Sequence, residues 1–150
     1  MTSSVELRHV DTDNWRACAD LEVAAEQRDF VAPVARYLCL CHYGDVWQPL
    51  AVYAADEVVG FVMWAVDPGD QSGWIGGLLI AQARQRKGYG RATVEALTRR
   101  LLESGACSSC ALSYSPENTA ARALYASLGF VETGEIEGDE LVARLSPSGR

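Results

Sequence analysis

The sequence predicts a single mixed α/β domain that spans residues 1–150. A chain of 150 residues is long enough to bury a hydrophobic core, and 49% of its residues are hydrophobic. Stretches rich in β-branched and aromatic residues alternate with stretches whose apolar residues recur at helical spacing. No internal repeat, linker or low-complexity segment divides the chain. These observations indicate one domain in which helices pack on a sheet.

The N-terminal part begins with a strand and two helices. Residues 5–10 alternate in side-chain character, which predicts a first strand. Asp13 or Asn14 can cap a helix that continues to Glu22. A proline before residues 34–43 and a glycine after them predict a second, short helix.

Three β-rich segments follow. Residues 49–54 and 58–66 predict a hairpin whose turn is residues 55–57. Residues 67–73 contain Gly, Pro and Asp and predict a loop. Residues 74–80 predict the next strand.

The C-terminal half alternates between helix and strand. Residues 91–103 and 118–128 show helical apolar stripes, and a glycine ends each helix. Residues 110–115 predict a strand, and residues 130–133 and 140–145 predict a last hairpin. The predicted order is therefore β-α-α-β-β-β-α-β-α-β-β.

Residues 85–90, Gln-Arg-Lys-Gly-Tyr-Gly, form the turn between a predicted strand and a predicted helix. Such a turn presents backbone N–H groups to a phosphate, and Gly88 and Gly90 lack the Cβ that would keep an anion away. The spacing fits neither G-x-x-x-x-G-K-[ST] nor G-x-G-x-x-G. Taken alone, the turn is equally compatible with a tight bend that carries solvated arginines.

Two segments together resemble a known family. Residues 85–90 match Q/R-x-x-G-x-G/A, and residues 118–130 match N-x-x-A-x-x-L-Y-x-x-L-G-F. These resemble the two signatures of the GNAT superfamily of acetyl-CoA-dependent N-acetyltransferases, and they occur in the family's order. The resemblance implies a mixed, mostly antiparallel sheet of six to seven strands flanked by about four helices.

The resemblance also implies where acetyl-CoA binds. Its pyrophosphate would lie at the glycine turn, and its pantetheine arm would pair with the strand before the turn, where a backbone N–H near Leu79 would donate to the oxyanion. The cofactor-binding residues expected on this basis are Leu79, Ile80, Gln85, Arg86, Lys87, Gly88, Tyr89, Gly90, Arg91 and Asn118.

Tyr125 is the candidate general acid. A tyrosine with a reference pKa of ~10 can protonate a thiolate whose conjugate acid has a pKa of ~8.5. Tyr125 also lies on the apolar stripe of its helix, so a buried core tyrosine is the alternative. The base is open: residues 74–80 contain no carboxylate, which leaves a water chain, Glu22, Glu26 or Asp29.

Several segments resemble bacterial spermine/spermidine acetyltransferases within the superfamily. They include Asn14-Trp15, Gln27-x-x-Phe30-Val31-Ala32, Gly88-Tyr89-Gly90, Pro116-Glu117-Asn118 and Thr133-Gly134-Glu135. The resemblance implies a polyamine such as spermine or spermidine as acceptor. One departure is the pair Gly76-Gly77, where a charged or bulky residue is expected and where a bulge or a plain kink would fit.

The charge distribution suits a cationic acceptor. Residues 84–100 carry six Lys or Arg and one Glu, a formal charge of +5 within a chain of net charge -7. One basic island in an acidic protein suits an anionic cofactor and a cationic substrate, and argues against nucleic acid. Glu22, Glu26 and Asp29 are the expected substrate-binding carboxylates, with Trp47, Tyr53, Trp64 and Tyr114 as available aromatic residues.

Other functions stay open at this point. The acceptor could be a peptide N-terminus, a lysine or an aminoglycoside, or the chain could be a non-catalytic acetyl-CoA-binding regulatory protein. Tyr125 disfavours the last. An acidic surface that only aids solubility would give the same net charge.

The remaining expectations concern thiols, metals and location. Cys107 and Cys110 have C-x-x-C spacing, but no second pair or following His completes a zinc site, so we expect five buried or half-buried free thiols and no metal. No apolar run approaches the ~20 residues needed to span a bilayer. Residues 1–6 lack the basic and apolar regions of a signal peptide. We expect a cytoplasmic homodimer.

Overall fold

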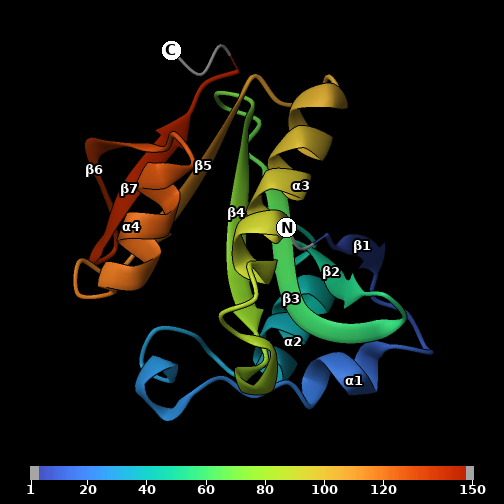
Figure 1. Ribbon diagram of the computed structural model, residues 1–150. Helices are drawn as coiled ribbons and strands as arrows, with labels where there is room; N and C mark the ends of the chain where they lie inside the picture. Colours follow the sequence, from blue (N-terminus) through green and yellow to red (C-terminus); the bar gives the residue numbers. More distant parts are fainter. Residues whose placement is uncertain (1–3, 148–150) are drawn as a thin grey trace.

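The computed structural model describes residues 4–147. Residues 1–3 and 148–150 lie outside the described part. The expectation that residues 1–6 are not a signal peptide therefore falls partly outside it. A seven-stranded sheet in the order β1-β2-β3-β4-β5-β7-β6 forms the centre of the domain (Figure 1). Only β4 and β5 pair in parallel within this sheet, and the other neighbours are antiparallel.

The elements follow the predicted order, with two short 3-10 turns added. The strands are β1 (Glu6–His9), β2 (Gln48–Ala54), β3 (Glu57–Val66), β4 (Ser72–Ile80), β5 (Ser109–Tyr114), β6 (Val131–Glu137) and β7 (Glu140–Leu145). The helices are α1 (Trp15–Ala19), α2 (Val34–Gly44), α3 (Tyr89–Glu103) and α4 (Thr119–Ser127), and the 3-10 turns are η1 (Ala25–Gln27) and η2 (Gln82–Arg84). The predicted mixed α/β fold is confirmed.

The first helix is shorter than predicted. It ends at Ala19 instead of continuing to Glu22, and the irregular chain that follows buries Val23. Asn14 occupies the N-cap position, but its side chain does not cap the helix and instead bonds to the Asp11 N–H and the His9 carbonyl. The segment between α1 and α2 is therefore mostly irregular.

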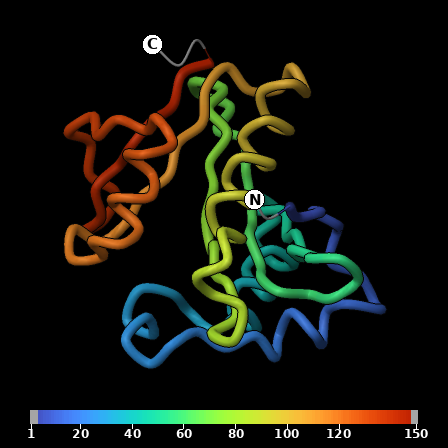
Figure 2. Tube along the Cα trace, viewed as in Figure 1, coloured from blue at the N-terminus to red at the C-terminus, as the bar shows by residue number. Residues whose placement is uncertain are grey.

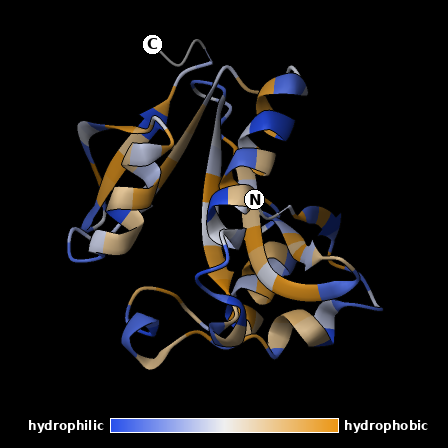
Figure 3. Cartoon of the chain, viewed as in Figure 1, coloured by the Kyte–Doolittle hydropathy of each residue, from blue (hydrophilic) through white to orange (hydrophobic). Residues whose placement is uncertain are grey.

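Two apolar clusters cover the two faces of the sheet. Alternate residues of β2 divide between them, with Leu50 and Val52 in one cluster and Ala51 in the other. The first cluster packs under α3, whose predicted stripe of Val94, Leu97 and Leu101 is buried. The second packs under α1 and α2. Figure 3 shows the hydrophobic residues concentrated in the central strands. Within residues 4–147, no helix has the length and apolar character needed to cross a membrane.

β4 and β5 separate soon after they begin. They pair only where Ser72–Trp74 lies beside Ser109–Ala111, and from there β5 pairs with β7 alone. Figures 1 and 2 show β5, α4, β6 and β7 diverging from β4 and α3. The result is a splay between these two strands. It leaves the backbone of β4 from Ile75 onward without a strand partner on that side, and such polar groups need another partner.

Candidate active site

A bulge interrupts β4 at the glycine pair. Phe61 pairs with Leu79 and Met63 pairs with Gly76, so Val62 stands opposite two residues, one of them Gly77. Gly77 has a φ of +61°, and a Cβ there would lie 3.3 Å from Met63 Cγ. A side chain at this position would be strained, so the bulge depends on glycine.

A cavity of about 270 Å³ surrounds the glycine turn. Eight of the ten predicted cofactor-binding residues line it: Leu79, Ile80, Gln85, Arg86, Gly88, Tyr89, Gly90 and Asn118. Lys87 and Arg91 are not part of its wall, and the Arg91 guanidinium donates to Ser127 Oγ at 2.5 Å. We call this the cofactor cavity.

The cofactor cavity has the properties of an anion site. Gly88 takes a left-handed conformation with φ +86° and precedes α3, a helix of 15 residues with no acidic residue in its first turn. The N–H groups at the start of α3 and the positive end of its dipole therefore meet no internal carboxylate. Arg86 and Arg84, whose guanidinium pairs with Glu57, line the cavity, and within residues 4–147 no acidic residue does.

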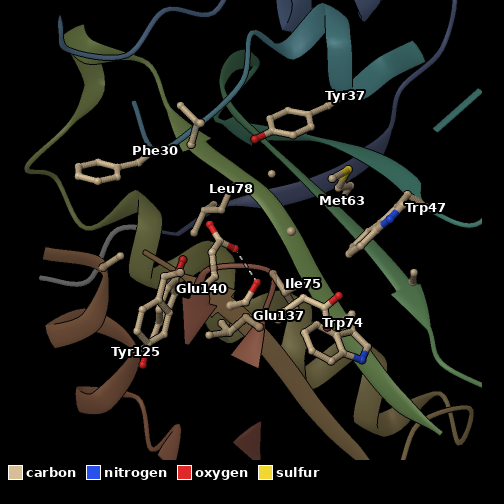
Figure 4. A pocket seen from close by; sticks show the side chains of 18 of the residues that line it. Phe30, Tyr37, Trp47, Met63, Trp74, Ile75, Leu78, Tyr125, Glu137 and Glu140 are labelled. Carbon is tan, nitrogen blue, oxygen red and sulfur yellow. Dashed lines mark hydrogen bonds between the residues drawn. The ribbon is translucent and has the colours of Figure 1, made fainter. Parts of the chain in front are cut away.

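A second cavity, of about 590 Å³, lies along β4 from Trp74 to Leu78. Among the described residues, three carboxylates line it, from Asp67, Glu137 and Glu140, and no Lys, Arg or His does. Its aromatic residues are Phe30, Tyr37, Trp47, Trp74, Tyr114 and Tyr125. Figure 4 shows Trp47 and Met63 across the cavity from Tyr125, Glu137 and Glu140. We call this the acceptor cavity.

Tyr125 stands where the two cavities meet. It lines both of them, together with Phe30, Val31, Leu78, Asn118 and Ala121. Asn118 caps α4 by accepting a hydrogen bond from the Ala121 N–H at 3.3 Å, which fixes the first turn of the helix that carries Tyr125.

The environment of Tyr125 keeps its hydroxyl protonated. Burial, and to a lesser degree the negative charge of Glu140, raises the pKa of Tyr125 to about 12. The rings of Tyr114 and Phe130 pack against it at centroid distances of 5.5 and 6.1 Å. Among the described residues, its hydroxyl has no hydrogen-bond partner, whereas the Tyr114 hydroxyl donates to Glu132 at 2.8 Å. Tyr125 is thus a proton donor without an internal acceptor.

The carboxylates of the acceptor cavity come from the last hairpin. Glu140, at the start of β7, is the cross-strand partner of Glu137, at the end of β6. Ser113 Oγ of β5 donates to Glu140 Oε1 at 2.8 Å, the contact drawn as a dashed line in Figure 4. Glu137 makes no ion pair or hydrogen bond within residues 4–147.

The structure does not bring the predicted substrate carboxylates into either cavity. Glu22, Glu26 and Asp29 are all exposed and belong to the irregular segment after α1. Of the aromatic residues considered, Trp47 and Tyr114 line the acceptor cavity, while Tyr53 and Trp64 pack against the core clusters. Reasoning from the sequence missed Asp67, Glu137 and Glu140. The density of acidic residues in 132–140 is the one sequence signal that points to the hairpin.

Neither disulfides nor metal sites are found among the described residues. All five cysteines are unpaired, and burial raises the pKa of the Cys110 thiol to about 12. Cys39 differs from the expectation because it lies on the outer side of α2 and is exposed. Among the described residues, no group of three His, Cys, Asp or Glu side chains is arranged to hold a metal ion.

Comparisons with known proteins identify the family of the chain. The sequence profile of the acetyltransferase (GNAT) family matches residues 7–130. A spermine/spermidine N(1)-acetyltransferase of Bacillus subtilis (strain 168) is 30% identical over 145 residues, which cover 89% of this chain and 92% of that protein.

Solved structures share the fold. A crystal structure of aminoglycoside acetyltransferase AAC(6')-Ib with coenzyme A and kanamycin has a TM-score of 0.82 and 20% identity, covering 97% of this chain and 96% of that chain. Spermidine N-acetyltransferase from Vibrio cholerae, with CoA and spermine, has a TM-score of 0.73 and 21% identity, covering 94% of this chain and 93% of that chain. At these identities the likeness concerns the fold alone.

Proposed function

The chain belongs to the acetyltransferase (GNAT) family and is an N-acetyltransferase; from that premise we propose that it transfers an acetyl group from acetyl-CoA to a primary amine of a polyamine such as spermine or spermidine. The observation that carries this proposal is the opposite charge of two cavities that share Tyr125. The cofactor cavity has two arginines and no acid, while the acceptor cavity has three carboxylates and no base.

The cofactor cavity suits the phosphates of acetyl-CoA. The N–H groups around Gly88 and Gly90 and the guanidinium of Arg86 would bind the pyrophosphate. The unpaired edge of β4 from Leu78 to Ile80, which lines the cofactor cavity, would bind an extended chain that carries amide groups, as a sheet edge binds an added strand. Acetyl-CoA supplies the activated acetyl thioester there.

The acceptor cavity suits an extended polycation. Carboxylates bind ammonium groups by charge-assisted hydrogen bonds, and aromatic faces attract cations. From Trp74 to Leu78, β4 runs for roughly 13 Å at about 3.3 Å per residue. That length is on the scale of an extended amine with several charges. Glu137 and Glu140 line the acceptor cavity together with Tyr125, whereas Glu22, Glu26 and Asp29 line neither cavity and would attract the approaching substrate through their charge.

Tyr125 would act when the sulfur leaves. Its hydroxyl, protonated at neutral pH because its pKa is raised, would donate a proton to the departing thiolate. The N–H groups of the bulged part of β4, near Leu79, would stabilise the oxyanion. The attacking amine must first lose a proton, and Glu137 and Glu140 join Glu22, Glu26, Asp29 and solvent water as candidates to receive it.

A thiol-release assay with acetyl-CoA tests the function. The panel contains spermine, spermidine, an aminoglycoside, a lysine peptide, a peptide with a free N-terminus and a neutral primary amine. We expect the highest kcat/KM with a polyamine, falling as salt rises because steering by charge is screened. Turnover restricted to the neutral amine or to the peptides would overturn the polyamine assignment, and no turnover with any amine would favour a regulatory acetyl-CoA-binding protein.

The assembly is a separate expectation. We propose a homodimer, as expected at the sequence level. Light scattering on the purified protein tests this, and a monomer mass at the enzyme concentration of the assay would contradict it.

A further inference from the structure

The irregular segment between α1 and α2 forms a wall of both cavities. Val23 and Gln27 line the cofactor cavity, and Phe30 and Val31 line both cavities. Figure 2 shows this segment, in blue, running beside the turn between β4 and α3. Apart from the single turn η1, it has no regular structure of its own, so its position depends on what it is attached to.

Two hydrogen bonds attach the segment to η2 and to the glycine turn of residues 85–90, which together we call the cofactor turn. The Gln82 N–H donates to the Glu22 carbonyl at 2.7 Å. Gln85 Nε2 donates to Gln27 Oε1 at 2.7 Å, and Gln27 Oε1 also accepts from the Ala24 N–H at 3.1 Å. The Gln27 side chain therefore holds the start of η1 through Ala24 and holds the cofactor turn through Gln85.

The side chain of Gln85 points into the protein. Its Nε2 donates one hydrogen bond to Gln27 Oε1 and another to the Ile80 carbonyl at 2.8 Å. An amide nitrogen has two hydrogens, so neither is left for a phosphate. Gln85 thus fixes the end of β4 and, through Gln27, the wall that contains Phe30 and Val31. Backbone N–H groups and Arg86 remain to bind the phosphate.

We propose that Gln27 is a positioning residue that couples the two cavities, because it holds the wall containing Phe30 and Val31 against the cofactor turn. The proposal rests on the proposed function, since it concerns the geometry of the acceptor site for that reaction. Binding of coenzyme A steadies the turn, and through Gln85 and Gln27 it steadies the wall that the amine contacts. The acceptor cavity is then complete only beside an ordered cofactor turn.

Kinetics of Gln27→Met test the coupling. Methionine keeps the length of the side chain and removes the acceptor oxygen. We expect the KM for the best amine to rise about three- to tenfold, the effect of one lost hydrogen bond, and the affinity for coenzyme A to fall by no more than the same factor, because the coupling is reciprocal, while kcat stays within about twofold. Gln27→Glu keeps an acceptor oxygen, so its KM for the amine should lie close to that of the unaltered protein. Gln48→Met makes the same change at an exposed glutamine and should have no effect.

A double-mutant cycle and proteolysis separate positioning from general destabilisation. Gln85→Met combined with Gln27→Met should raise the KM by less than the product of the two single effects, because the bond between Gln27 and Gln85 is lost in each single variant. Tryptic cleavage after the exposed Arg28 should be faster in Gln27→Met, and coenzyme A should protect the unaltered protein more than the variant. Additive effects, an unchanged KM or equal protection would overturn the proposal. Absence of turnover in the unaltered protein would instead count against the proposed function, while proteolysis still tests the coupling.

Discussion

Glu137 and Glu140 lie directly opposite each other across the β6–β7 hairpin, and both line the acceptor cavity. Like charges at opposed positions of antiparallel strands are destabilising. Within residues 4–147, neither carboxylate has a basic partner, although Arg122 and Arg144 pair with other carboxylates of the same hairpin. The repulsion between the two carboxylates destabilises the protein without ligand, and a bound cation would relieve it.

The two glutamates should therefore show a trade-off between stability and binding. Glu137→Gln should raise Tm by up to about 2–4 °C and raise the KM for spermidine about tenfold, because it removes repulsion and an ammonium contact together. Glu140→Gln should behave alike, since a glutamine oxygen can still accept from Ser113 Oγ. Thermal melts and steady-state kinetics measure both effects.

Exposed carboxylates outside the cavity provide the comparison. Glu26→Gln and Asp29→Asn remove the same charge from the segment after α1 and should raise the KM for the amine less than the hairpin variants do. An equal or larger rise would place the acceptor beside that segment, as expected from the sequence alone.

Tyr125→Phe should lower kcat by roughly 10²–10⁴-fold with little change in the KM for acetyl-CoA, because the hydroxyl acts only as the thiolate leaves. Since this hydroxyl has no partner among the described residues, its loss should leave Tm nearly unchanged. Tyr114→Phe is the matched control. It breaks the bond to Glu132 and should reduce stability more than turnover. Wild-type turnover in Tyr125→Phe would return Tyr125 to the role of a core residue.

Gly90→Val should weaken acetyl-CoA binding at least about tenfold, because it adds two methyl groups and a Cβ to the wall of the cofactor cavity. Gly90 is a cleaner position than Gly88, whose φ of +86° would strain any side chain. A Cβ on Gly90 would meet Ile80 and Leu124 at 3.9 and 4.0 Å, ordinary contact distances. Calorimetry with coenzyme A checks the affinity, and unchanged binding by a folded variant would refute the site.

The order of elements and the cofactor turn were predictable because both depend on nearby residues. Periodicity within 91–103 defines α3, and the spacing of Gly88 and Gly90 defines the turn before it. The exceptions involve contacts with other parts of the chain. α1 ends early, before an irregular stretch that buries Val23, and β4 begins at Ser72, within the predicted loop, where it pairs with β5.

The acceptor cavity was not predictable in the same way. Glu140 reaches it because β7 pairs with β5, a contact between segments far apart in the sequence. The bulge at Gly77 decides which side chains of β4 face the cavity, and a one-residue change of register moves every following side chain to the other face. Carboxylates chosen for their nearness to Phe30 in sequence were therefore not those that the fold brings to the cavity.

Stability should fall steeply at alkaline pH. Burial raises the pKa of Cys18 to about 11, and burial with the hydrogen bond to Glu132 raises that of Tyr114 to about 12, as burial does for Tyr125. Each of these groups binds its proton more tightly in the folded protein than in the unfolded protein. Their stabilisation is thus complete below pH ~9 and is lost as the pH rises through 11 to 12. Urea denaturation across this range measures the loss, and a flat profile would contradict the shifts.

Gly76→Ala should change the acceptor cavity without touching the cofactor turn. The new Cβ would lie 3.1 Å from Cη2 and Cζ3 of Trp47, so the indole must move by a few tenths of an ångström. Because Trp47 lines the acceptor cavity, the KM for the amine should rise about three- to tenfold, while coenzyme A affinity stays unchanged.

Trp47→Phe tests the cause of the Gly76 effect. Phenylalanine lacks the far edge of the indole, so in that background an alanine at position 76 meets no ring atoms. The two changes should therefore be non-additive, with Gly76→Ala adding little to the KM already set by Trp47→Phe. Steady-state kinetics of the two single variants and the double variant measure the coupling. Strict additivity would mean that alanine acts through the β4 backbone instead of the indole, and the glycine pair would then serve the bulge rather than the shape of the acceptor cavity.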